Sequence, residues 1–287
     1  FKEIKMEENE SFDEFYTKLK NIVELDGCHL KGKFGGHILS ATAKDGNENI
    51  FPVALGVVEQ ENKDSWVWFL QTFADDIGRP DELNLVFISD RQKVIQFTCF
   101  LRLLFVLNHY ISAFESFVFI LRQMVFIFVL WIFFDCIYDN QGLIPAMEML
   151  FPTVEHRFCV KHIYNNFKLN FKGLELKAAL WRCAAATTVR EFEKRMQDMK
   201  ELDKEAWEYL ADIQPTQWTK SHFTPRAISD CYVNNLSESF NSMILEARDK
   251  PIIAMLEWIR VRLMTRMYSK RTRIEKFTSD ICLTIEQ

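Results

Sequence analysis

A strongly apolar segment, residues 94–141, divides the sequence in two and limits what the chain can fold into. Its 48 residues contain no Gly, Pro or Lys and hold ten of the chain's 26 phenylalanines. Every residue of Met124–Phe134 is apolar. A helix buried in a globular core shows a polar stripe at helical period, and residues 117–134 show none. The segment is therefore foreign to an ordinary globular domain.

Two interpretations of this segment remain. The first is a membrane span within residues 103–134. Its 18 residues 117–134 are close to the roughly 20 that a transmembrane helix needs. A central Arg122, however, costs roughly 2.5–3.5 kcal/mol on insertion. A U-rich intron read in frame gives Phe, Leu, Ile, Val, Cys and Tyr, which dominate here. The segment begins with Val94 (GU codons) and ends with Gln141 (CAG codon), so both splice-site dinucleotides are permitted. We interpret residues 94–141 as a translated intron.

The composition of the whole chain is that of a globular protein, with 48% hydrophobic and 26% charged residues. A length of 287 residues suffices for one large domain or two small ones. The net charge of −5 excludes a cationic nucleic-acid coat, so any DNA contact must come from local patches. Seven irregularly spaced cysteines indicate a reducing compartment. Because the chain starts at Phe1 without a targeting pattern, we expect a fragment of a longer reading frame.

The periodicity of the flanking parts predicts an α/β order. The expected strands are residues 21–27, 36–46, 49–59, 82–90 and 153–159, and the fourth, apolar throughout, is expected at the centre of the sheet. The expected helices are residues 1–20, 63–77, 142–151 and 160–171, several between 173 and 218, and then 235–248 and 252–276. In helix 63–77 the inward residues are Trp66, Phe69, Leu70 and Phe73. This is the order of a ribonuclease H-like fold.

Two aspartates follow apolar runs, Asp26 after "NIVEL" and Asp90 after "LVFIS". Carboxylates at the ends of adjacent central strands can share Mg²⁺ ions, which prefer oxygen ligands. Two such ions activate a water or a 3′-hydroxyl and stabilise the leaving oxygen in phosphoryl displacement. Each residue also has a structural interpretation, since Asp26 precedes Gly27 and can turn a hairpin, and Asp90 can cap the next helix.

Four sequence blocks carry a more specific signal. They are "LDGCHLKGKFGGHILSATAKDGNENIFPVALGVVEQENKDSWVWFL", "FISDRQK" joined to "GLIPAMEMLFP" once the apolar segment is removed, "HRFCVKHIYNNFK" and "NNLSESFNSMI". In this order they resemble the catalytic blocks of Mutator-like element (MULE) transposases, over roughly residues 21–260 without the apolar segment. The resemblance implies a ribonuclease H-like DDE transposase fold with a helical insertion at about 173–218. It also implies that Asp26, Asp90 and Glu238 are the metal-binding catalytic triad, with Mg²⁺ or Mn²⁺ as cofactor.

The resemblance assigns Cys159 and His162 to an additional pair beside the active site. Three residues apart, they could form half of a Zn²⁺ site. His156 is near in sequence, but no second Cys/His pair occurs at matching spacing. The sequence therefore favours a buried thiol and a hydrogen-bonding or DNA-contacting imidazole, with Zn²⁺ not expected in this fragment.

Glu238 has a structural alternative as one acid on the solvated face of an amphipathic helix. Asn234, Asn235 and Asn241 flank it at helical spacing, which is compatible with phosphate or metal-water contacts. Glu246 is the nearest substitute. Trp181, Trp207 and Trp218 are expected in the core of the helical insertion rather than as platforms that stack on bases.

The last expected helix is strongly basic. Spaced along it, basic side chains can neutralise DNA phosphates, although a solvated face that balances the acidic N-terminal region explains them equally well. The candidate DNA-binding residues are Arg260, Arg262, Arg266, Lys270, Arg271 and Arg273.

These patterns predict a domain organisation and a function. We expect a helical flank at 1–20, a catalytic domain at 21–93 and 142–260, the foreign segment at 94–141 and a basic helix and tail at 261–287. The expected function is metal-dependent cleavage and transfer of DNA at transposon ends in the nucleus, by a homo-oligomer that has no membrane contact unless the foreign segment is translated and exposed. The resemblance also implies flanking DNA-binding and zinc modules, which this fragment lacks. A domesticated, non-catalytic DNA-binding regulator and a membrane-anchored protein are the alternatives.

Overall fold

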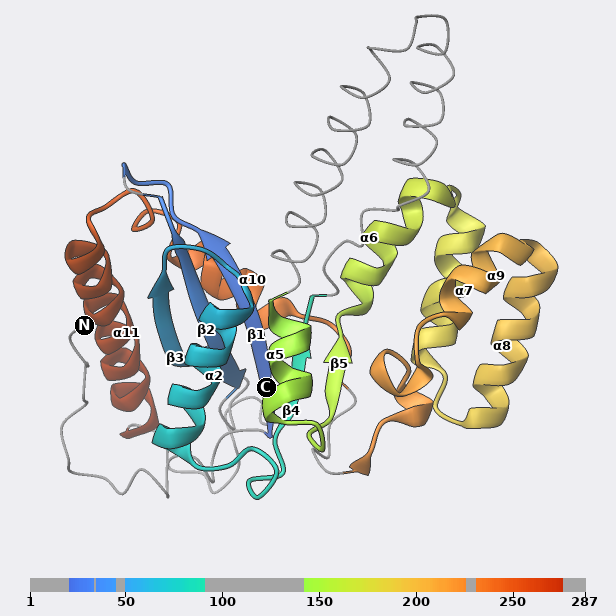
Figure 1. The fold of residues 1–287 in the computed structure, drawn as a ribbon, viewed down its shortest axis with the longest axis horizontal. Helices are drawn as coiled ribbons and strands as arrows, with labels where there is room; N and C mark the ends of the chain where they lie inside the picture. The colour runs from blue at the N-terminus through green and yellow to red at the C-terminus, as the bar shows by residue number, and fades with distance from the viewer. Residues whose placement is uncertain (1–20, 34, 45–49, 91–141, 226–230, 276–287) are drawn as a thin grey trace, which may run out of the picture.

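Five strands form one mixed sheet, and eight α-helices surround it in the described part of the chain (Figure 1). The structure, a computed structural model, describes residues 21–33, 35–44, 50–90, 142–225 and 231–275. The predicted α/β class is confirmed. The helix expected at 1–20 and the apolar segment 94–141 lie outside the described residues.

The sheet has the order β3-β2-β1-β4-β5. Its strands are β1 (Ile22–His29), β2 (His37–Lys44), β3 (Ile50–Val58), β4 (Val86–Ser89) and β5 (His156–Phe158). β1, β2 and β3 pair antiparallel, whereas β4 runs parallel to both β1 and β5. β4 is therefore an interior strand, as its uninterrupted apolar run predicted.

Two of the predicted strands are shorter than expected. The strand expected at 82–90 spans only Val86–Ser89 because residues 81–84 form a turn, in which Asn84 takes a left-handed φ of 53°. The strand expected at 153–159 is reduced to β5, His156–Phe158. The helix expected at 235–248 ends at Met243 and continues as turns.

Helices cover both faces of the sheet. α2 (Lys63–Ile77) and α5 (Leu143–Leu150) pack together on one face. α10 (Asn235–Met243) packs on the other face, where α11 (Ile252–Glu275) shares its apolar cluster (Figure 1). In the described residues, no helix is long and apolar enough to span a membrane.

Helix α2 matches the sequence prediction at both ends. The Asn62 side chain accepts a hydrogen bond from Ser65 N (2.9 Å) and caps the first turn. Gly78 ends the helix with a φ of 97°, which glycine adopts without steric cost. The four residues predicted to face inward are all buried: Trp66, Phe69, Leu70 and Phe73.

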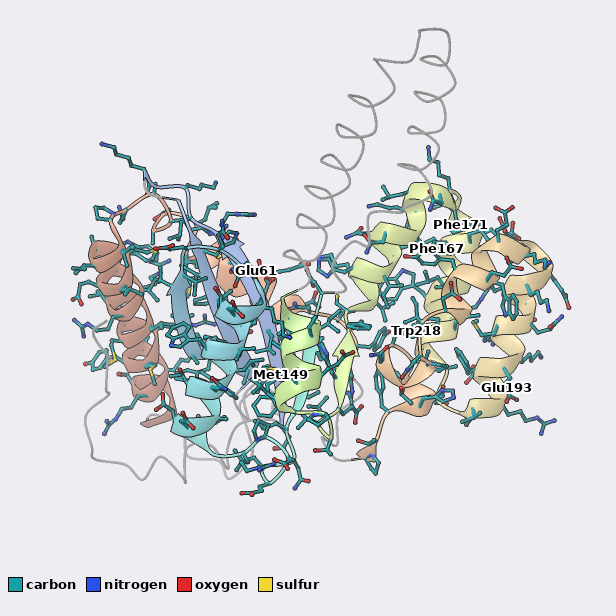
Figure 2. The ribbon with its side chains drawn as sticks, viewed as in Figure 1. Glu61, Met149, Phe167, Phe171, Glu193 and Trp218 are labelled. Atoms are coloured by element: carbon teal, nitrogen blue, oxygen red, sulfur yellow. The ribbon has the colours of Figure 1, made fainter. Side chains whose placement is uncertain are left out.

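A helical unit extends from the β5 edge of the sheet. It comprises α6 (Val160–Asn170), α7 (Leu174–Ala185), α8 (Val189–Leu202) and α9 (Lys204–Ala211), followed by short 3-10 turns at Pro215–Gln217 and Lys220–His222. Trp218 is fully buried in its core, and Trp181 and Trp207 pack partly buried against the same cluster, as predicted. Figure 2 shows Phe167, Phe171 and Trp218 inside this unit.

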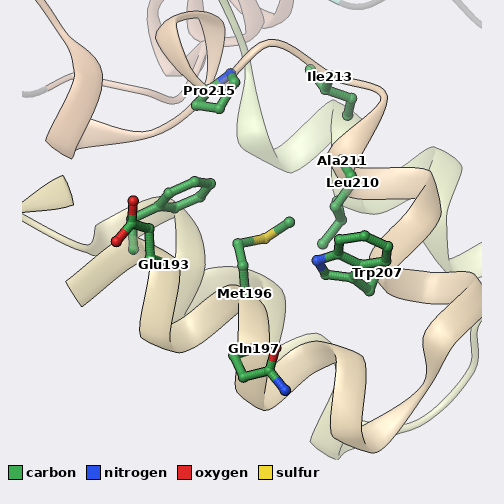
Figure 3. A pocket seen from close by; sticks show the side chains of 9 residues that line it. Glu193, Met196, Gln197, Trp207, Leu210, Ala211, Ile213 and Pro215 are labelled. Atoms are coloured by element: carbon green, nitrogen blue, oxygen red, sulfur yellow. The ribbon is translucent and has the colours of Figure 1, made fainter. Parts of the chain in front are cut away.

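An open apolar pocket of about 350 Å³ lies between α8 and α9. Figure 3 shows Met196 and Trp207 facing each other across it, with Glu193 at its edge. It shares no lining residue with the acidic cavity described next.

Candidate active site

Asp26 and Asp90 occupy equivalent positions on neighbouring parallel strands. The parallel pairing of β1 with β4 ends at Leu25 opposite Ser89, and the two aspartates are the next residues of each chain segment. The expectation that Asp26 ends its strand is wrong. β1 continues to His29 because Gly27, Cys28 and His29 still pair with β2. The two aspartates nonetheless lie next to each other, directly after the last paired residues of the two parallel strands.

A cavity of about 150 Å³ opens where this ladder ends. Its polar lining consists of three acids, Asp26, Glu61 and Asp90, and its other lining residues are Leu25, Gly27, Trp66, Leu143 and Ile144. Burial, together with the smaller effect of the charges of Asp90 and Glu61, raises the pKa of Asp26 to about 7. The cavity thus concentrates negative charge, which a bound cation would offset.

Glu61 is a third acid of this cavity that the sequence analysis missed. It precedes α2 (Figure 2). Its carboxylate accepts a hydrogen bond from Trp66 Nε1 (3.3 Å). A Cβ atom on Gly27 would lie 2.4 Å from the Glu61 carboxylate, so only glycine at position 27 allows this approach. Burial raises the pKa of Glu61. A single acid in a polar loop does not by itself indicate a site residue. The glycine after Asp26 was the one indication in the sequence that another group approaches the backbone there.

Glu238 lies in the first turn of α10 and reaches the site through two residues of α6. Its Oε2 accepts from Lys161 Nζ at 2.5 Å. Its Oε1 lies 3.9 Å from His162 Nε2, while His162 Nδ1 lies 2.5 Å from Asp90 Oδ1. His162 therefore stands between the second aspartate and the glutamate.

Two asparagines that flank Glu238 contact the aspartates directly. Asn241 Nδ2 donates to Asp26 Oδ2 at 2.7 Å, and Asn234 Nδ2 lies 3.4 Å from Asp90 Oδ1. Asn235 is exposed. Asn234 and Asn241 thus orient carboxylates. The contacts with phosphate or metal-bound water, with which their spacing is compatible, stay a prediction.

Helix α10 is anchored by Glu24, a second acid that the sequence analysis missed. Glu24 is 1% exposed, and its Oε2 accepts from Leu236 N (2.7 Å) and Ser237 N (3.0 Å) at the start of α10. Burial raises its pKa to about 8, although these two hydrogen bonds act in the opposite direction. Glu24 and Asp26 are two residues apart and therefore lie on the same face of β1. This spacing was the one sequence pattern that linked Glu24 to the site.

Cys159 and His162 join the same site from the start of α6. Cys159 is fully buried, its N–H donates to Ser89 O (2.9 Å), and its Sγ accepts from Asn234 N (3.1 Å). The ligand atoms of Asp90, Cys159 and His162 all lie within 4.8 Å of one another. Burial lowers the pKa of His162, but hydrogen bonds with Asp90 and Cys159 outweigh it and raise that pKa to about 10.

The basic residues of α11 make contacts on their own side of the sheet. Arg260 pairs with Glu257 at 2.7 Å, Arg262 lies over the Trp258 ring at 5.8 Å, and Arg266 contacts Met243. Lys270 is half-buried and Arg271 is exposed, while the side chain of Arg273 lies outside the described residues. Glu246, the sequence-based substitute for Glu238, lies in the turns after α10 and is exposed.

The fold and the site define a mixed α/β protein whose parallel strands present carboxylates at one edge. The family model of the MULE transposase domain matches residues 22–103, a range that includes Asp26 and Asp90. Residues 22–103 are therefore similar to the MULE transposase domain, and the resemblance found in the sequence motifs is confirmed over this range. The matched range ends inside the apolar segment, before Cys159, His162 and Glu238. No curated protein matches the chain.

Proposed function

We propose that this chain is the catalytic domain of a DDE-type DNA transposase with a ribonuclease H-like fold. One observation carries the proposal. Asp26 and Asp90 directly follow the last paired residues of the parallel strands β1 and β4, and both line the same acidic cavity. The match to the MULE transposase domain supports it and implies interaction with DNA. Glu238 is the third acid of the proposed triad.

The donor set fits Mg²⁺ or Mn²⁺. The charged lining residues of the cavity are all carboxylates, and Asp26 is partly buried beside like charges. Hard divalent cations prefer such oxygen ligands. Asp26 and Asp90 would hold the ion together with Glu238 of α10. When bound, such ions activate the attacking oxygen and stabilise the leaving oxygen of phosphoryl transfer.

The protein's own groups fix the orientation of these carboxylates. Asn241 holds one oxygen of Asp26 through its amide N–H. His162 holds Asp90 and lies between it and Glu238, so the imidazole sets their separation. Lys161 balances the charge of Glu238. Substrate phosphates would approach from the side of Lys161, whose side chain is 45% exposed.

We further propose that residues 94–141 are a translated intron and that the intact 287-residue chain lacks strand-transfer activity. The segment lies directly between the β4–Asp90 junction and α5, which packs on the sheet beside the cavity. Amplification of the transcript across this junction tests the origin of the segment. We expect a second product shorter by 144 nucleotides, three for each of the 48 codons. A single long product in every tissue refutes the intron.

The function is tested by Mg²⁺-dependent nicking of plasmid DNA. A form with Lys93 joined to Gly142, first checked for folding by circular dichroism, is expected to nick DNA, whereas the intact chain is not. Asp26→Asn removes the charge of a proposed ligand and should abolish nicking. Asp212→Asn, at an exposed position after α9, is the matched control and should keep it. Equal nicking by the joined form and by its Asp26→Asn variant contradicts the assignment.

The second candidate is a domesticated, non-catalytic DNA-binding regulator in the nucleus. The interruption next to Asp90 favours it, because such a regulator tolerates a broken active site. DNA binding by the intact chain, together with no nicking by the joined form, would select this candidate.

A homo-oligomer is proposed in either case, and sedimentation of the joined form on DNA tests it. Release of the protein into the soluble fraction only after removal of residues 94–141 would assign membrane attachment or aggregation to that segment.

A further inference from the structure

We propose that Asp90, Cys159 and His162 form a binding site for a zinc-class divalent cation beside the oxygen-lined cavity. The inference goes beyond DNA strand transfer and does not depend on it. Among the described residues, this is the one group in which three such side chains bring their ligand atoms within 4.8 Å of one another.

The backbone fixes two of the three ligands next to each other. The N–H of Cys159 donates to Ser89 O at 2.9 Å, which places Cys159 beside the residue that precedes Asp90. His162 lies one helical turn further on, and its N–H donates to Cys159 O at 3.0 Å. The C-x-x-H spacing on the first turn of α6 therefore directs thiol and imidazole to the same side.

The third ligand comes from the sheet. His162 Nδ1 lies 2.5 Å from Asp90 Oδ1, so a slight separation of these atoms would admit a metal at ordinary bond lengths of about 2.0–2.3 Å. The Cys159 side chain is fully buried, whereas those of Asp90 and His162 are 34% and 25% exposed. This arrangement provides three protein ligands and a side open to water, which is typical of zinc sites that keep a fourth position free.

The donor types set this site apart from the neighbouring cavity. Sulfur and imidazole nitrogen select zinc-class ions, while Mg²⁺ prefers oxygen. Asp90 faces oxygen donors of Asp26 and Glu61 on one side and the thiol–imidazole pair on the other. Zn²⁺ was not expected from the sequence because no second Cys/His pair occurs at matching spacing. Asp90, which directly follows β4 and precedes Cys159 by 69 residues, supplies the third ligand instead.

Cobalt(II) is the probe, because a thiolate ligand gives it an intense sulfur-to-metal charge-transfer band in the near ultraviolet. The intact 287-residue chain, first treated with a chelator, is titrated with Co²⁺ in the absence of DNA. We expect the charge-transfer band to appear, to survive an excess of Mg²⁺ and to disappear when Zn²⁺ is added. Absence of the band at saturating Co²⁺, or its loss on addition of Mg²⁺, overturns the proposal.

Two cysteine variants decide which thiol is the ligand. Cys159→Ser keeps an acceptor for the N–H of Asn234 and should lose the band. Cys183→Ser is the matched control, because Cys183 is also fully buried but lies in the helical unit, and it should keep the band. Persistence of the band in Cys159→Ser overturns the assignment.

His162→Gln provides a second measurement if Cys159→Ser does not fold. Loss of one ligand should weaken Co²⁺ affinity roughly 10-fold or more, and unchanged affinity contradicts the site. Because the band is recorded without DNA, a lack of nicking leaves this result unaffected, and a missing band leaves the nicking assay unaffected. The two proposals therefore fail separately.

Discussion

The two faces of the sheet are covered in contrasting ways. The face under α2 and α5 is an apolar cluster in which Val23, Leu25 and Leu39 of the sheet meet Phe69 and Phe73 of α2. The face under α10 mixes apolar contacts with fully buried polar groups. These are Glu24, Thr42, Asn234 and Ser237.

The difference follows from what each face holds in place. Apolar packing is non-directional and tolerates small displacements, which suffices for α2 and α5. Hydrogen bonds are directional, so Glu24, Thr42 and Asn241 fix the rotation and height of the helix that carries Glu238. The α2 face therefore mainly supplies stability, and the α10 face supplies the position of an acid.

The largest expected effect is on the apolar face. Phe73 is 2% exposed and packs edge-on against Phe87. Phe73→Ala should lower the free energy of unfolding by about 3–5 kcal/mol, because it removes buried surface and leaves a cavity. Urea denaturation followed by circular dichroism measures the loss. Trp68→Ala on the same helix, at a site 40% exposed, is the control and should cost about 1 kcal/mol or less. Equal losses would mean that α2 does not dock as described.

Glu24→Ala is the corresponding change on the polar face. It leaves the N–H groups of Leu236 and Ser237 buried without their acceptor, at a cost of about 2–3 kcal/mol. Unlike Phe73→Ala, it should also reduce nicking by the joined form under conditions in which the variant remains folded. A stability loss with full nicking would show that Glu24 does not position α10.

Much of the fold was accessible from local pattern, whereas the anchors of the site were not. Helix α2 was predicted to the residue because the apolar spacing of its inward side chains is a local signal. Asp26 and Asp90 were found because each follows an apolar run. Glu24 bonds to Leu236, 212 residues away in the sequence, and no local pattern indicates which distant helix covers a strand. Glu61 was missed for the same reason.

The polar face should also make stability depend on pH. Burial raises the pKa of Glu24 from 4.5 to about 8, so the folded state binds a proton that the unfolded state releases between these values. Its contribution to stability is therefore complete below about pH 4.5 and is lost as the pH rises toward 8. One pKa unit corresponds to about 1.4 kcal/mol. Unfolding measured from pH 5 to pH 8 should show this decline. Glu24→Gln, which cannot ionise, should make it shallower, while Asp26, whose pKa is raised to about 7, maintains part of it. A decline of equal slope in Glu24→Gln assigns it to other groups.

The smallest effect is expected from the neutral hydrogen bond beside Glu24. Thr42 Oγ1 and Ser237 Oγ lie 3.0 Å apart, and both side chains are fully buried. Thr42→Val keeps the shape of the side chain but leaves the Ser237 hydroxyl unpaired, which should cost about 1 kcal/mol. Because Glu24 still holds the start of α10, the joined form with Thr42→Val should nick DNA nearly as well as the joined form without this substitution. Glu24→Ala and Thr42→Val together distinguish the position of Glu238 from the stability of the fold. Both variants weaken the packing of α10 on the sheet, but only the loss of the Glu24 carboxylate should move Glu238. A parallel loss of nicking in both variants would mean that α10 is held by the face as a whole rather than by its one buried acid.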